Sequence, residues 1–405
     1  MCIRDSSSCF SSSPSHHPIC LLYKTSYLHF YLYFRQFIKK LCVIVFLFIF
    51  FTRVKIRIFG IMVKTKIKNM EEFAQASGIS RPTISKFFND PSSVRESLRS
   101  KIEAALEKYD YYPNFYAINQ NRQLTKNIGI VVPYVSDPFF AEIARNLERR
   151  CIDAGYTPFL FSSHGEQAQE NTILDTLRSL KPAGVLMAPL GRRSSDKSKI
   201  EKFCKNVPTI LFDSNLEGLG AAFIGSDNHS FISQTVEYLN STGSAPIFFE
   251  MRYPANPNAN KRREAYLKIM DGLKLKPQVI SIEGTGWKFE EIGRQGALKL
   301  LRENGMHTNT VLCSNDRLAI GFLSACSEMG VKVGKTKNCD LRVAGSDDSP
   351  YSKFTSPPLT TAAHDYDSVS NNAALALFEL INNGGKSKKR SETLYSAKLV
   401  LRDSA

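Results

Sequence analysis

The amino-acid sequence predicts a small all-α domain followed by a larger, two-lobed α/β core. Between residues 69 and 114, apolar side chains recur at helical spacing in three short segments separated by turn signals. From Ile128 onward, short apolar runs alternate with amphipathic helical patterns, which is the rhythm of a parallel β-sheet covered by helices. A chain of 405 residues is also long enough to bury more than one sizeable core.

The first helix of the small domain is predicted to begin after Asn69. This side chain can cap the helix, and Glu72, three positions later, can complete a capping box. One helical face then carries Met70, Phe73, Ala74 and Ser77. Gly78 follows where the chain must turn sharply, because glycine adopts left-handed backbone angles without a steric penalty.

Two further helices complete the predicted three-helix domain. The second helix is capped by Ser80 or Arg81, tolerates Pro82 in its first turn and ends near Asn89. The third helix runs from about Glu96 to Tyr109. Its apolar stripe consists of Leu98, Ile102, Ala105, Leu106 and Tyr109. Such a bundle can present its second helix to DNA, although three-helix bundles without a DNA role have the same pattern.

The α/β pattern of the core indicates two lobes. Its first part alternates strand and helix over Ile128–Val132, Phe139–Ala154, Pro158–Phe161, Gln167–Leu180 and Gly184–Met187. Further strands are expected at Thr209–Phe212, Ile247–Phe249, Ile280–Ile282, Val311–Cys313 and Val343–Ala344. These strands are enough for two parallel sheets. In such folds ligands bind in a cleft at the carboxyl ends of the strands.

The predicted strands end in polar and aromatic side chains. These are Asp137, Phe139, Phe140, Asp213, Asn315, Asp316 and Asp347. Carboxylates and amides exchange hydrogen bonds with hydroxyl groups, and aromatic rings cover apolar ring faces, so the set favours a polyhydroxyl ligand. Each residue alone has another interpretation, because an aspartate at a strand end often caps a helix and neighbouring phenylalanines often belong to the core.

The segment from Asn69 to Asn114 carries a spaced set of residues that occur together in one known family. The positions are Phe73-Ala74, Gly78-Ile79-Ser80, Thr83-Ile84-Ser85-Lys86, Asn89, Val94 and Tyr112-Pro113-Asn114. On these residues the segment resembles the helix-turn-helix headpiece of LacI/GalR transcription regulators, in which the second helix enters the major groove. The resemblance implies DNA contacts from Ser80, Arg81, Pro82, Thr83, Ser85, Lys86, Asn89, Asn114, Ala117 and Gln120.

Two positions depart from the family pattern. Pro82 stands where a hydrogen-bonding side chain is common, so readout of that base pair is expected to be weak or directed at a thymine methyl group. Gln120 stands where the family's hinge helix inserts a leucine into the minor groove, and a polar side chain cannot wedge base steps apart in the same way. We therefore expect Arg81 and Lys86 to dominate base readout.

The stretch from Ile128 to Ser404 resembles the effector domain of the same family and periplasmic sugar-binding proteins, its Pro357–Thr361 and Leu399–Ser404 segments included. The resemblance implies two Rossmann-like parallel-sheet subdomains of the type I periplasmic-binding-protein-like kind. It implies effector contacts from Asp137, Phe139, Phe140, Asp213, Arg262, Trp287, Asn315, Asp347 and His364. The implied organisation is a headpiece at 66–111, a hinge at 112–126, and an effector-binding and dimerisation core at 127–405.

Residues 1–61 are expected to be a non-native or disordered leader, with translation starting at Met62. They include Leu41–Phe51, an apolar run of eleven residues, whereas a membrane span needs about 20. The basic residues before this run imitate a signal peptide, but no small-residue cleavage site follows it. A membrane-anchored regulator and a disordered native tail are the alternatives.

The composition and motifs exclude several classes of function. The net charge is +15, but the first 62 residues hold eight Lys or Arg and one Asp, so the charge supports DNA binding less than its total suggests. The nine cysteines form no CxxC pair or zinc-like Cys/His cluster, which predicts reduced thiols and no metal or other cofactor. GxSxG, GxxxxGK[ST] and HExxH are absent, and no GxGxxG follows the first strand, so no enzyme is expected.

These observations together predict a sequence-specific DNA-binding transcription regulator, expected to be a repressor, whose operator affinity is controlled by a sugar-like effector. The expected partners are a double-stranded DNA operator, a small-molecule effector and a second copy of the chain in a homodimer. We expect the protein in the bacterial cytoplasm, associated with the nucleoid and without stable membrane association. The alternative is a solute-binding protein of a sugar transport system, which would share the core but have no use for Asn69–Asn114.

Overall fold

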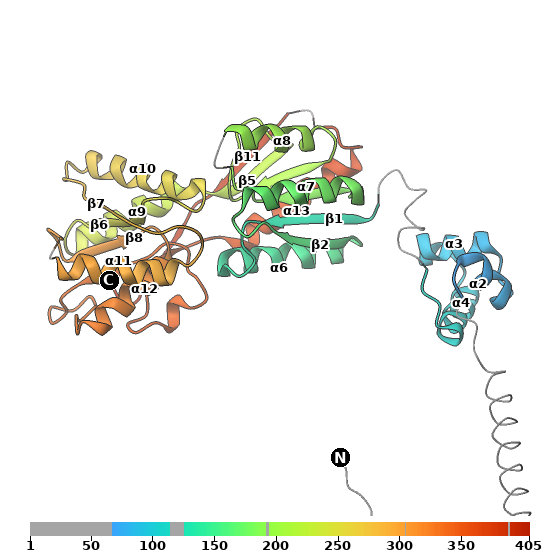
Figure 1. Ribbon diagram of the computed structural model, residues 1–405, viewed down its shortest axis with the longest axis horizontal. Coiled ribbons are helices and arrows are strands. Elements are labelled where there is room, and N and C mark those ends of the chain that lie inside the picture. Colours follow the sequence, from blue (N-terminus) through green and yellow to red (C-terminus); the bar gives the residue numbers. More distant parts are fainter. Residues whose placement is uncertain (1–66, 114–124, 192–193, 304, 388) are drawn as a thin grey trace, which may run out of the picture. The chain divides into compact units, whose positions relative to one another are not determined.

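The computed structural model of the chain describes residues 67–113, 125–191, 194–303, 305–387 and 389–405. The chain divides into two compact units, Met1–Gln120 and Asn121–Ala405. The first unit holds a helical headpiece and the second holds the α/β core (Figure 1). The expected leader and the expected hinge contacts at Asn114, Ala117 and Gln120 lie outside the described residues.

Three α-helices form the headpiece, as the apolar spacing predicts. They are α2 (Met70–Ser77), α3 (Arg81–Asn89) and α4 (Glu96–Tyr109), with the short 3₁₀ helix η1 (Pro91–Ser93) between the last two. The predicted bounds of all three helices are confirmed to within one residue.

Local hydrogen bonds explain where α2 begins and ends. The Glu72 amide donates to Asn69 Oδ1 at 2.9 Å, which confirms the predicted cap. The return bond differs from a standard capping box, because the amide of Lys68, not that of Asn69, donates to the Glu72 carboxylate. Gly78 ends the helix with φ of 69°, and Ser80 precedes α3 without a side-chain capping bond.

A small aromatic core holds the three helices together. Its fully buried side chains include Phe73, Ile84 and Ile102. The ring of Tyr111 stacks on Phe73 with 4.6 Å between centroids. The Tyr109 hydroxyl donates to the carbonyl of Ala76 at 2.7 Å, which fixes the end of α4 against the end of α2. The headpiece core is thus formed by the inner faces of its helices and leaves the outer face of α3 exposed.

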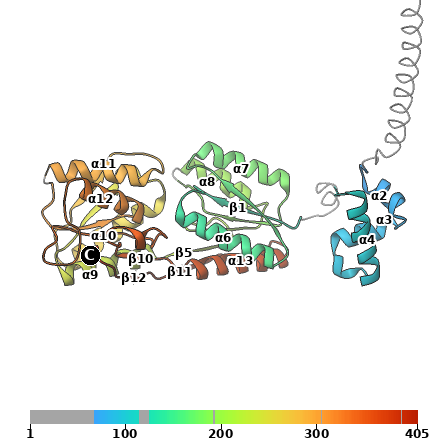
Figure 2. The same ribbon diagram turned by 90° about the horizontal axis from the view of Figure 1, so that it is seen from below.

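The first lobe of the core is a six-stranded parallel sheet in the order β11-β5-β4-β3-β1-β2. Its strands are β1 (Asn127–Val132), β2 (Thr157–Ser162), β3 (Gly184–Met187), β4 (Thr209–Phe212), β5 (Ala222–Ser226) and β11 (Ser391–Tyr395). One face is covered by α6 (Pro138–Asp153) and α13 (Tyr366–Asn382), the other by α7 (Gln167–Leu180) and α8 (Ser194–Cys204) (Figure 2). Because both faces are covered, the central strands β1, β3 and β4 are buried throughout and mostly apolar.

The second lobe has the same layered construction around a four-stranded parallel sheet in the order β7-β6-β8-β9. Its strands are β6 (Ile247–Met251), β7 (Val279–Ile282), β8 (Thr310–Cys313) and β9 (Arg342–Ala344). The covering helices are α9 (Asn228–Thr242) and α10 (Pro257–Gly272) on one face and α11 (Phe289–Arg302) and α12 (Asp316–Glu328) on the other. The two predicted parallel sheets are confirmed.

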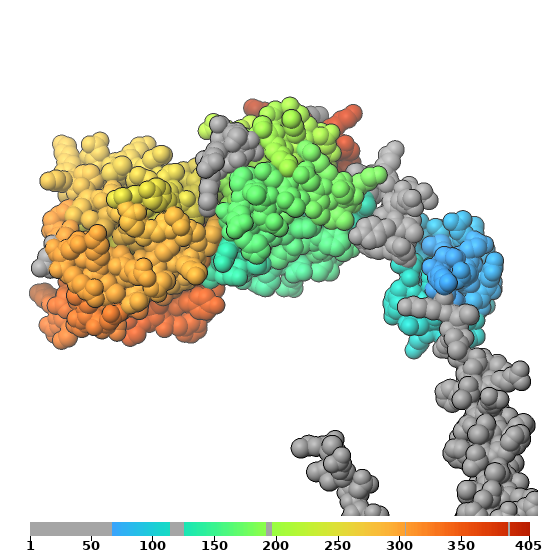
Figure 3. Space-filling view, in the orientation of Figure 1, coloured from blue at the N-terminus to red at the C-terminus, as the bar shows by residue number. Residues whose placement is uncertain are grey.

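The chain crosses between the lobes three times. It passes from β5 into α9, from β10 (Thr361–Ala363) into α13, and from β11 into β12 (Lys398–Val400), which pairs antiparallel with β10. Each lobe is therefore built from segments far apart in the sequence, and the lobes lie side by side (Figure 3). The first of these crossings starts at the carboxyl end of β5.

Two further features of the described residues bear on the predictions. Within them, no helix has both the length and the apolar character needed to cross a membrane. No group of three or more His, Cys, Asp or Glu side chains in the same residues is arranged to hold a metal ion.

Candidate functional site

The residues expected to read DNA lie on one surface of the headpiece, formed by the start and outer face of α3. Ser80, Arg81, Pro82, Lys86 and Asn89 are exposed, and Thr83 and Ser85 are half-buried. The opposite side of α3 is buried through Ile84 and Phe87. The helical period thus separates a packing face from a polar face, and the structure brings these seven predicted residues to the latter.

Arg81 has a weak internal partner in this surface. Its guanidinium lies 3.6 Å from the Glu71 carboxylate, and both side chains are more than half exposed. An exposed pair of this kind contributes little free energy, so it does not hold the guanidinium back from a base or a phosphate. Pro82 stands in the first turn of α3, where a missing backbone N–H leaves no hydrogen bond unmade.

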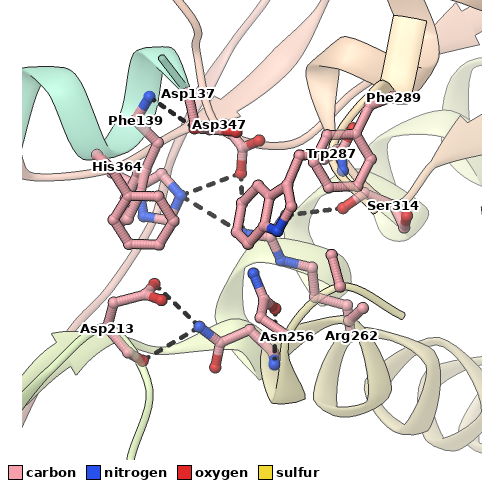
Figure 4. Close-up of a pocket in the computed structure, with 15 residues that line it drawn as sticks. Asp137, Phe139, Asp213, Asn256, Arg262, Trp287, Phe289, Ser314, Asp347 and His364 are labelled. Atoms are coloured by element: carbon pink, nitrogen blue, oxygen red, sulfur yellow. Dashed lines mark hydrogen bonds and ion pairs between the residues drawn. The ribbon is translucent and has the colours of Figure 1, made fainter. Parts of the chain in front are cut away.

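A second candidate site lies between the two lobes of the core (Figure 4). The pocket has about 520 Å³ of empty space, which includes space open to solvent. It brings together all nine effector contacts expected from the sequence, namely Asp137, Phe139, Phe140, Asp213, Arg262, Trp287, Asn315, Asp347 and His364. It also includes residues that the sequence prediction missed, namely Ala255, Asn256, Asn258, Ala259, Phe289 and Ser314.

Both lobes contribute to this pocket at the ends of their strands. Lobe one supplies the start of α6 after β1 and Asp213 after β4. Lobe two supplies Arg262 from α10, Trp287 ahead of α11 and Asp347 after β9. His364 comes from the crossing between β10 and α13. A ligand in the pocket therefore contacts both lobes and the segment that joins them.

Asp137 has two structural roles besides facing the pocket. Its Oδ1 accepts from the amide of Phe139 at 3.0 Å, so it caps α6. Its Oδ2 accepts from Arg317 Nη1 of the other lobe at 2.9 Å. Burial raises the pKa of Asp137, and the Arg317 guanidinium opposes that rise. Asp137 therefore both caps a helix and lines the pocket, so the two interpretations of this aspartate are compatible.

The two phenylalanines divide between core and pocket. Phe140 is 2% exposed and belongs to the hydrophobic core beneath the pocket. Phe139 is half-buried, and its ring centroid lies 4.6 Å from that of His364. An aromatic face is therefore available beside the polar groups, which is the combination that a sugar ring needs.

Arg262, Asp347 and His364 form a buried polar network in the pocket. Arg262 Nη2 lies 2.9 Å from Asp347 Oδ1, and His364 Nε2 lies 3.2 Å from the same oxygen. Burial alone would raise the pKa of Asp347, but the Arg262 guanidinium and His364 outweigh it and lower that pKa. Burial lowers the pKa of His364 in spite of the nearby carboxylate, so its imidazole is neutral at pH 7. The network presents fixed donors and acceptors to hydroxyl groups.

Asp213 lies across the pocket in an unusual backbone conformation, with φ of 58°. Asn258 Nδ2 of the other lobe donates to its Oδ1 at 2.9 Å and to its carbonyl at 3.1 Å. Burial raises the pKa of Asp213 to about 7, and Arg262 opposes the rise. This carboxyl group can therefore exchange a proton near neutral pH.

Trp287 closes one side of the pocket by reaching across to the first lobe. Its indole stacks on Tyr134, with 5.4 Å between centroids and 3° between ring planes. It also lies directly over Gly165, where any Cβ would overlap the indole Nε1. That buried Nε1–H has no hydrogen-bond partner among the described residues. Together with the Arg317–Asp137 and Asn258–Asp213 bonds, the stack holds the lobes in contact.

Some of the missed residues had a local signal in the sequence. Asn256 caps α10 through a bond from the amide of Asn258, and Asn-Pro-Asn is a readable helix start. Arg317 had no such signal, because its partner Asp137 lies 180 residues away in the chain.

Asp316, one of the strand-end aspartates, is not part of the pocket lining. It is fully buried and accepts from the Ser349 amide at 2.8 Å and the Thr361 hydroxyl at 2.6 Å. It ties α12 to the segment after β9. Burial raises its pKa to about 7.

A headpiece with an exposed polar helix face and a core with a polar pocket between two lobes are the two parts that a ligand-responsive DNA-binding protein needs. Two family descriptions match this chain. Residues 69–114 match the bacterial regulatory proteins of the lacI family, and residues 236–405 match a periplasmic binding protein-like domain.

Curated relatives extend the match over most of the chain. The transcriptional repressor PurR of Pasteurella multocida is 27% identical over 339 residues, which are 83% of this chain and 98% of that protein. The transcriptional repressor CytR of Escherichia coli K12 is 26% identical over 83% of this chain and 95% of its own length. The ribose operon repressor of the same strain is 27% identical over 72% of this chain and 86% of its own length.

Solved structures share the fold. A Lac repressor dimer bound to operator and the anti-inducer ONPF has a TM-score of 0.71 at 24% identity, covering 84% of this chain and 99% of that one. A LacI-family regulator from Enterococcus faecium with bound ribose has a TM-score of 0.58 at 19% identity, covering 69% of this chain and 98% of that one. Residues 69–114 thus match the DNA-binding domain of the lacI family, and the chain is a DNA-binding transcription regulator whose curated relatives are transcriptional repressors and not enzymes.

Proposed function

We propose that this chain is a repressor that binds a palindromic double-stranded DNA operator as a homodimer. A sugar-like effector raises or lowers its affinity for that operator. The observation that carries the proposal is the pocket itself, because its lining comes from both lobes and from a crossing segment. A ligand there changes the free energy of lobe closure, and coupling of this kind between two sites amounts to about 1–3 kcal/mol.

In this proposal the seven residues on the outer face of α3 contact DNA, with Arg81 and Lys86 reading bases. The hinge at 112–126 connects the headpiece at 66–111 to the core at 127–405, and its Asn114, Ala117 and Gln120 contact the minor groove or its backbone. The nine pocket residues predicted from the sequence contact the effector. Action on an operator also places the protein at the nucleoid in the bacterial cytoplasm.

Two kinds of relative support the effector class. Relatives of this chain include the ribose operon repressor, and a structural neighbour is described with bound ribose. The pocket of this chain combines carboxylates, amides and an aromatic face in the same volume. These are the groups that bind a polyhydroxyl ring.

The test is selection of bound sequences from a random double-stranded DNA library by the full chain. We expect enrichment of a palindrome with half-sites about one helical turn apart. The selected operator is then titrated with the protein in the presence of sugars, polyols and nucleosides, and one of them should change the apparent affinity. If the full chain enriches no sequence, the proposed DNA binding is wrong. If the parent protein and an Asp347→Asn variant enrich the same operator and no ligand alters the affinity of either, the proposed control of operator binding by an effector is wrong.

A further inference from the structure

The charges around the pocket restrict the effector more closely than its shape does. The charged side chains of the lining are Asp137, Asp213, Asp347 and Arg262, and Arg317, outside the lining, pairs with Asp137. Burial keeps His364 neutral, and no lysine lines the pocket among the described residues. Three carboxylates therefore face two guanidinium groups.

The Arg262 guanidinium is held by neighbouring groups on all three of its nitrogens. Nε donates to Asn228 Oδ1 at 3.0 Å, Nη1 donates to the Ser314 carbonyl at 2.7 Å, and Nη2 lies 2.9 Å from Asp347. Its side chain is 9% exposed. The positive charge is thus neutralised by Asp347 before any ligand arrives.

The Arg317 guanidinium is likewise held by neighbouring groups on all three of its nitrogens. Its Nη1 donates to Asp137 at 2.9 Å, its Nε donates to Glu290 at 2.6 Å, and its Nη2 donates to Glu290 and to the Trp287 carbonyl. Two carboxylates therefore surround this one cation. It holds the lobes together and offers no surplus positive charge to a ligand.

Asp213 is the lining carboxylate for which no ion pair within 4.0 Å is found among the described residues, and Arg262 and Lys261 act on it from farther away. Its printed partners are neutral, namely the Asn258 amide and the Ser214 hydroxyl at 3.2 Å, and no Lys or Arg nitrogen in the described chain lies within 4.0 Å of it. Lys261 acts on it only from an exposed position outside the lining. Burial raises the pKa of this group to about 7, so it is partly ionised at neutral pH, and a second negative charge beside it would be unfavourable.

We infer that the effector is a polyol of monosaccharide size that carries no anionic group and presents a hydroxyl or a protonated amine to Asp213. Sugar phosphates and sugar acids are excluded by the charge of the pocket. Neutral sugars and amino sugars fit, because a hydroxyl donates to the carboxylate and an ammonium group supplies a cation at ion-pair distance. This inference rests on the effector role proposed above.

Matched ligand series on one carbon skeleton test the inference. The purified full chain is titrated with glucose, glucosamine, glucuronate and glucose 6-phosphate, and with the corresponding galactose and ribose compounds. The readouts are thermal stabilisation and the fluorescence of Trp287, the chain's single tryptophan, which lies in the pocket. Within the best-binding skeleton, the neutral or amine form should bind at least about tenfold more tightly than either anionic form.

An Asp213→Asn variant isolates the charge from the shape. Asparagine tolerates the left-handed backbone conformation at this position, and its amide oxygen can still accept from Asn258, so the variant should fold. It should lose most of the preference for the amine form over the parent sugar and should bind the sugar acid better than the wild type does. Asp271→Asn, at the exposed far end of α10, matches the change in net charge and should leave all the ratios unaltered.

The outcomes separate two failures. If a sugar acid or sugar phosphate binds best, or if Asp213→Asn leaves every ratio unchanged, the charge inference is wrong and the effector role stands. If no compound of any series binds the wild type or alters its operator affinity, the effector role and the inference both fail.

Discussion

The DNA-reading surface and the pocket of this chain use arginine in opposite ways. Arg81 on α3 is 65% exposed and pairs only with an exposed glutamate, whereas Arg262 in the pocket is 9% exposed and is held on every nitrogen. The side chain of Arg262 is ordered when the protein folds, so a ligand does not have to order it. Arg81 must be ordered by the DNA. The comparison predicts that changes around the pocket alter stability and binding together, while changes on α3 alter DNA binding alone.

The largest expected effect comes from Gly165→Ala, which disturbs the contact between Trp287 and the first lobe. A Cβ at this position overlaps the Trp287 indole, and the φ of 72° is itself unfavourable for alanine. Strain of about 1–2 kcal/mol and overpacking of about 1–3 kcal/mol should add to a loss of about 2–5 kcal/mol in the free energy of unfolding. The lobes should also close less readily on a ligand. Urea unfolding followed through Trp287 fluorescence measures the stability change.

Gly155→Ala is the matched control for that change. Gly155 has a similar φ of 77°, but nothing lies within 4 Å of the position its Cβ would take. Only the backbone strain of about 1–2 kcal/mol should therefore appear. Equal losses in the two variants would show that contact between Gly165 and Trp287 does not support the closed pocket.

Arg81→Ala should have the second largest effect, and it should appear in DNA binding only. Loss of one bidentate base contact costs about 1–3 kcal/mol in operator affinity and relaxes the preference at one base pair. Stability should stay within about 0.5 kcal/mol, because the side chain is exposed and weakly paired. Operator titrations and thermal unfolding are the two measurements.

Lys276→Ala supplies the control for net charge in that experiment, since Lys276 is an exposed cation of the core. It should leave the base preference unaltered. A stability loss in Arg81→Ala comparable to its loss in operator affinity would break the proposed contrast between an exposed reading surface and a pre-ordered pocket.

The pH dependence of stability tests how deeply the pocket carboxyl is buried. The pKa of Asp213 is about 7 in the folded chain, from an ordinary value of 3.8, and Arg262, Lys261 and Asp347 act on it along with burial. The folded state therefore holds a proton that the unfolded state has released. The resulting stabilisation is complete below about pH 4 and is lost by about pH 7, with a slope of at most about 1.4 kcal/mol per pH unit.

Asp213→Asn should remove this contribution from the unfolding free energies measured between pH 4 and pH 7. A residual slope of similar sign is expected from Asp316, whose pKa burial also raises to about 7. The difference between variant and wild type isolates Asp213. Parallel curves would mean that this carboxyl group is ionised across the whole range.

Much of the architecture could be predicted because it depends on local periodicity. The helix Gln167–Leu180 and the strands Gly184–Met187 and Thr209–Phe212 have their predicted bounds, since their apolar residues recur at the spacing that burial requires. Strand β11 (Ser391–Tyr395) was missed because it is exposed at the sheet edge and has no apolar run. Short strands at chain crossings leave no periodic signal.

The pocket likewise has a part that could be predicted from the sequence and a part that could not. Strand-end positions and the family resemblance identified nine residues that lie in one pocket. They could be identified because the carboxyl ends of parallel strands meet at one edge of each sheet. Contacts between the lobes could not be predicted in this way. The Arg317–Asp137 pair and the stack of Trp287 on Tyr134 depend on how the two lobes meet, which no stretch of sequence encodes by itself.

The smallest expected effect concerns Pro82, and it sharpens the account of the reading surface. Pro82 is exposed in the first turn of α3 and can offer DNA only an apolar contact. Pro82→Gln adds a hydrogen-bonding side chain at the same position, so it should introduce a preference at one base pair worth about 1 kcal/mol or less. Pro82→Ala removes the ring without adding a donor and should leave that base pair nearly unselected. Sequencing of operators selected by the three proteins measures the difference, and identical profiles would mean that α3 meets the groove through other residues than the start of the helix.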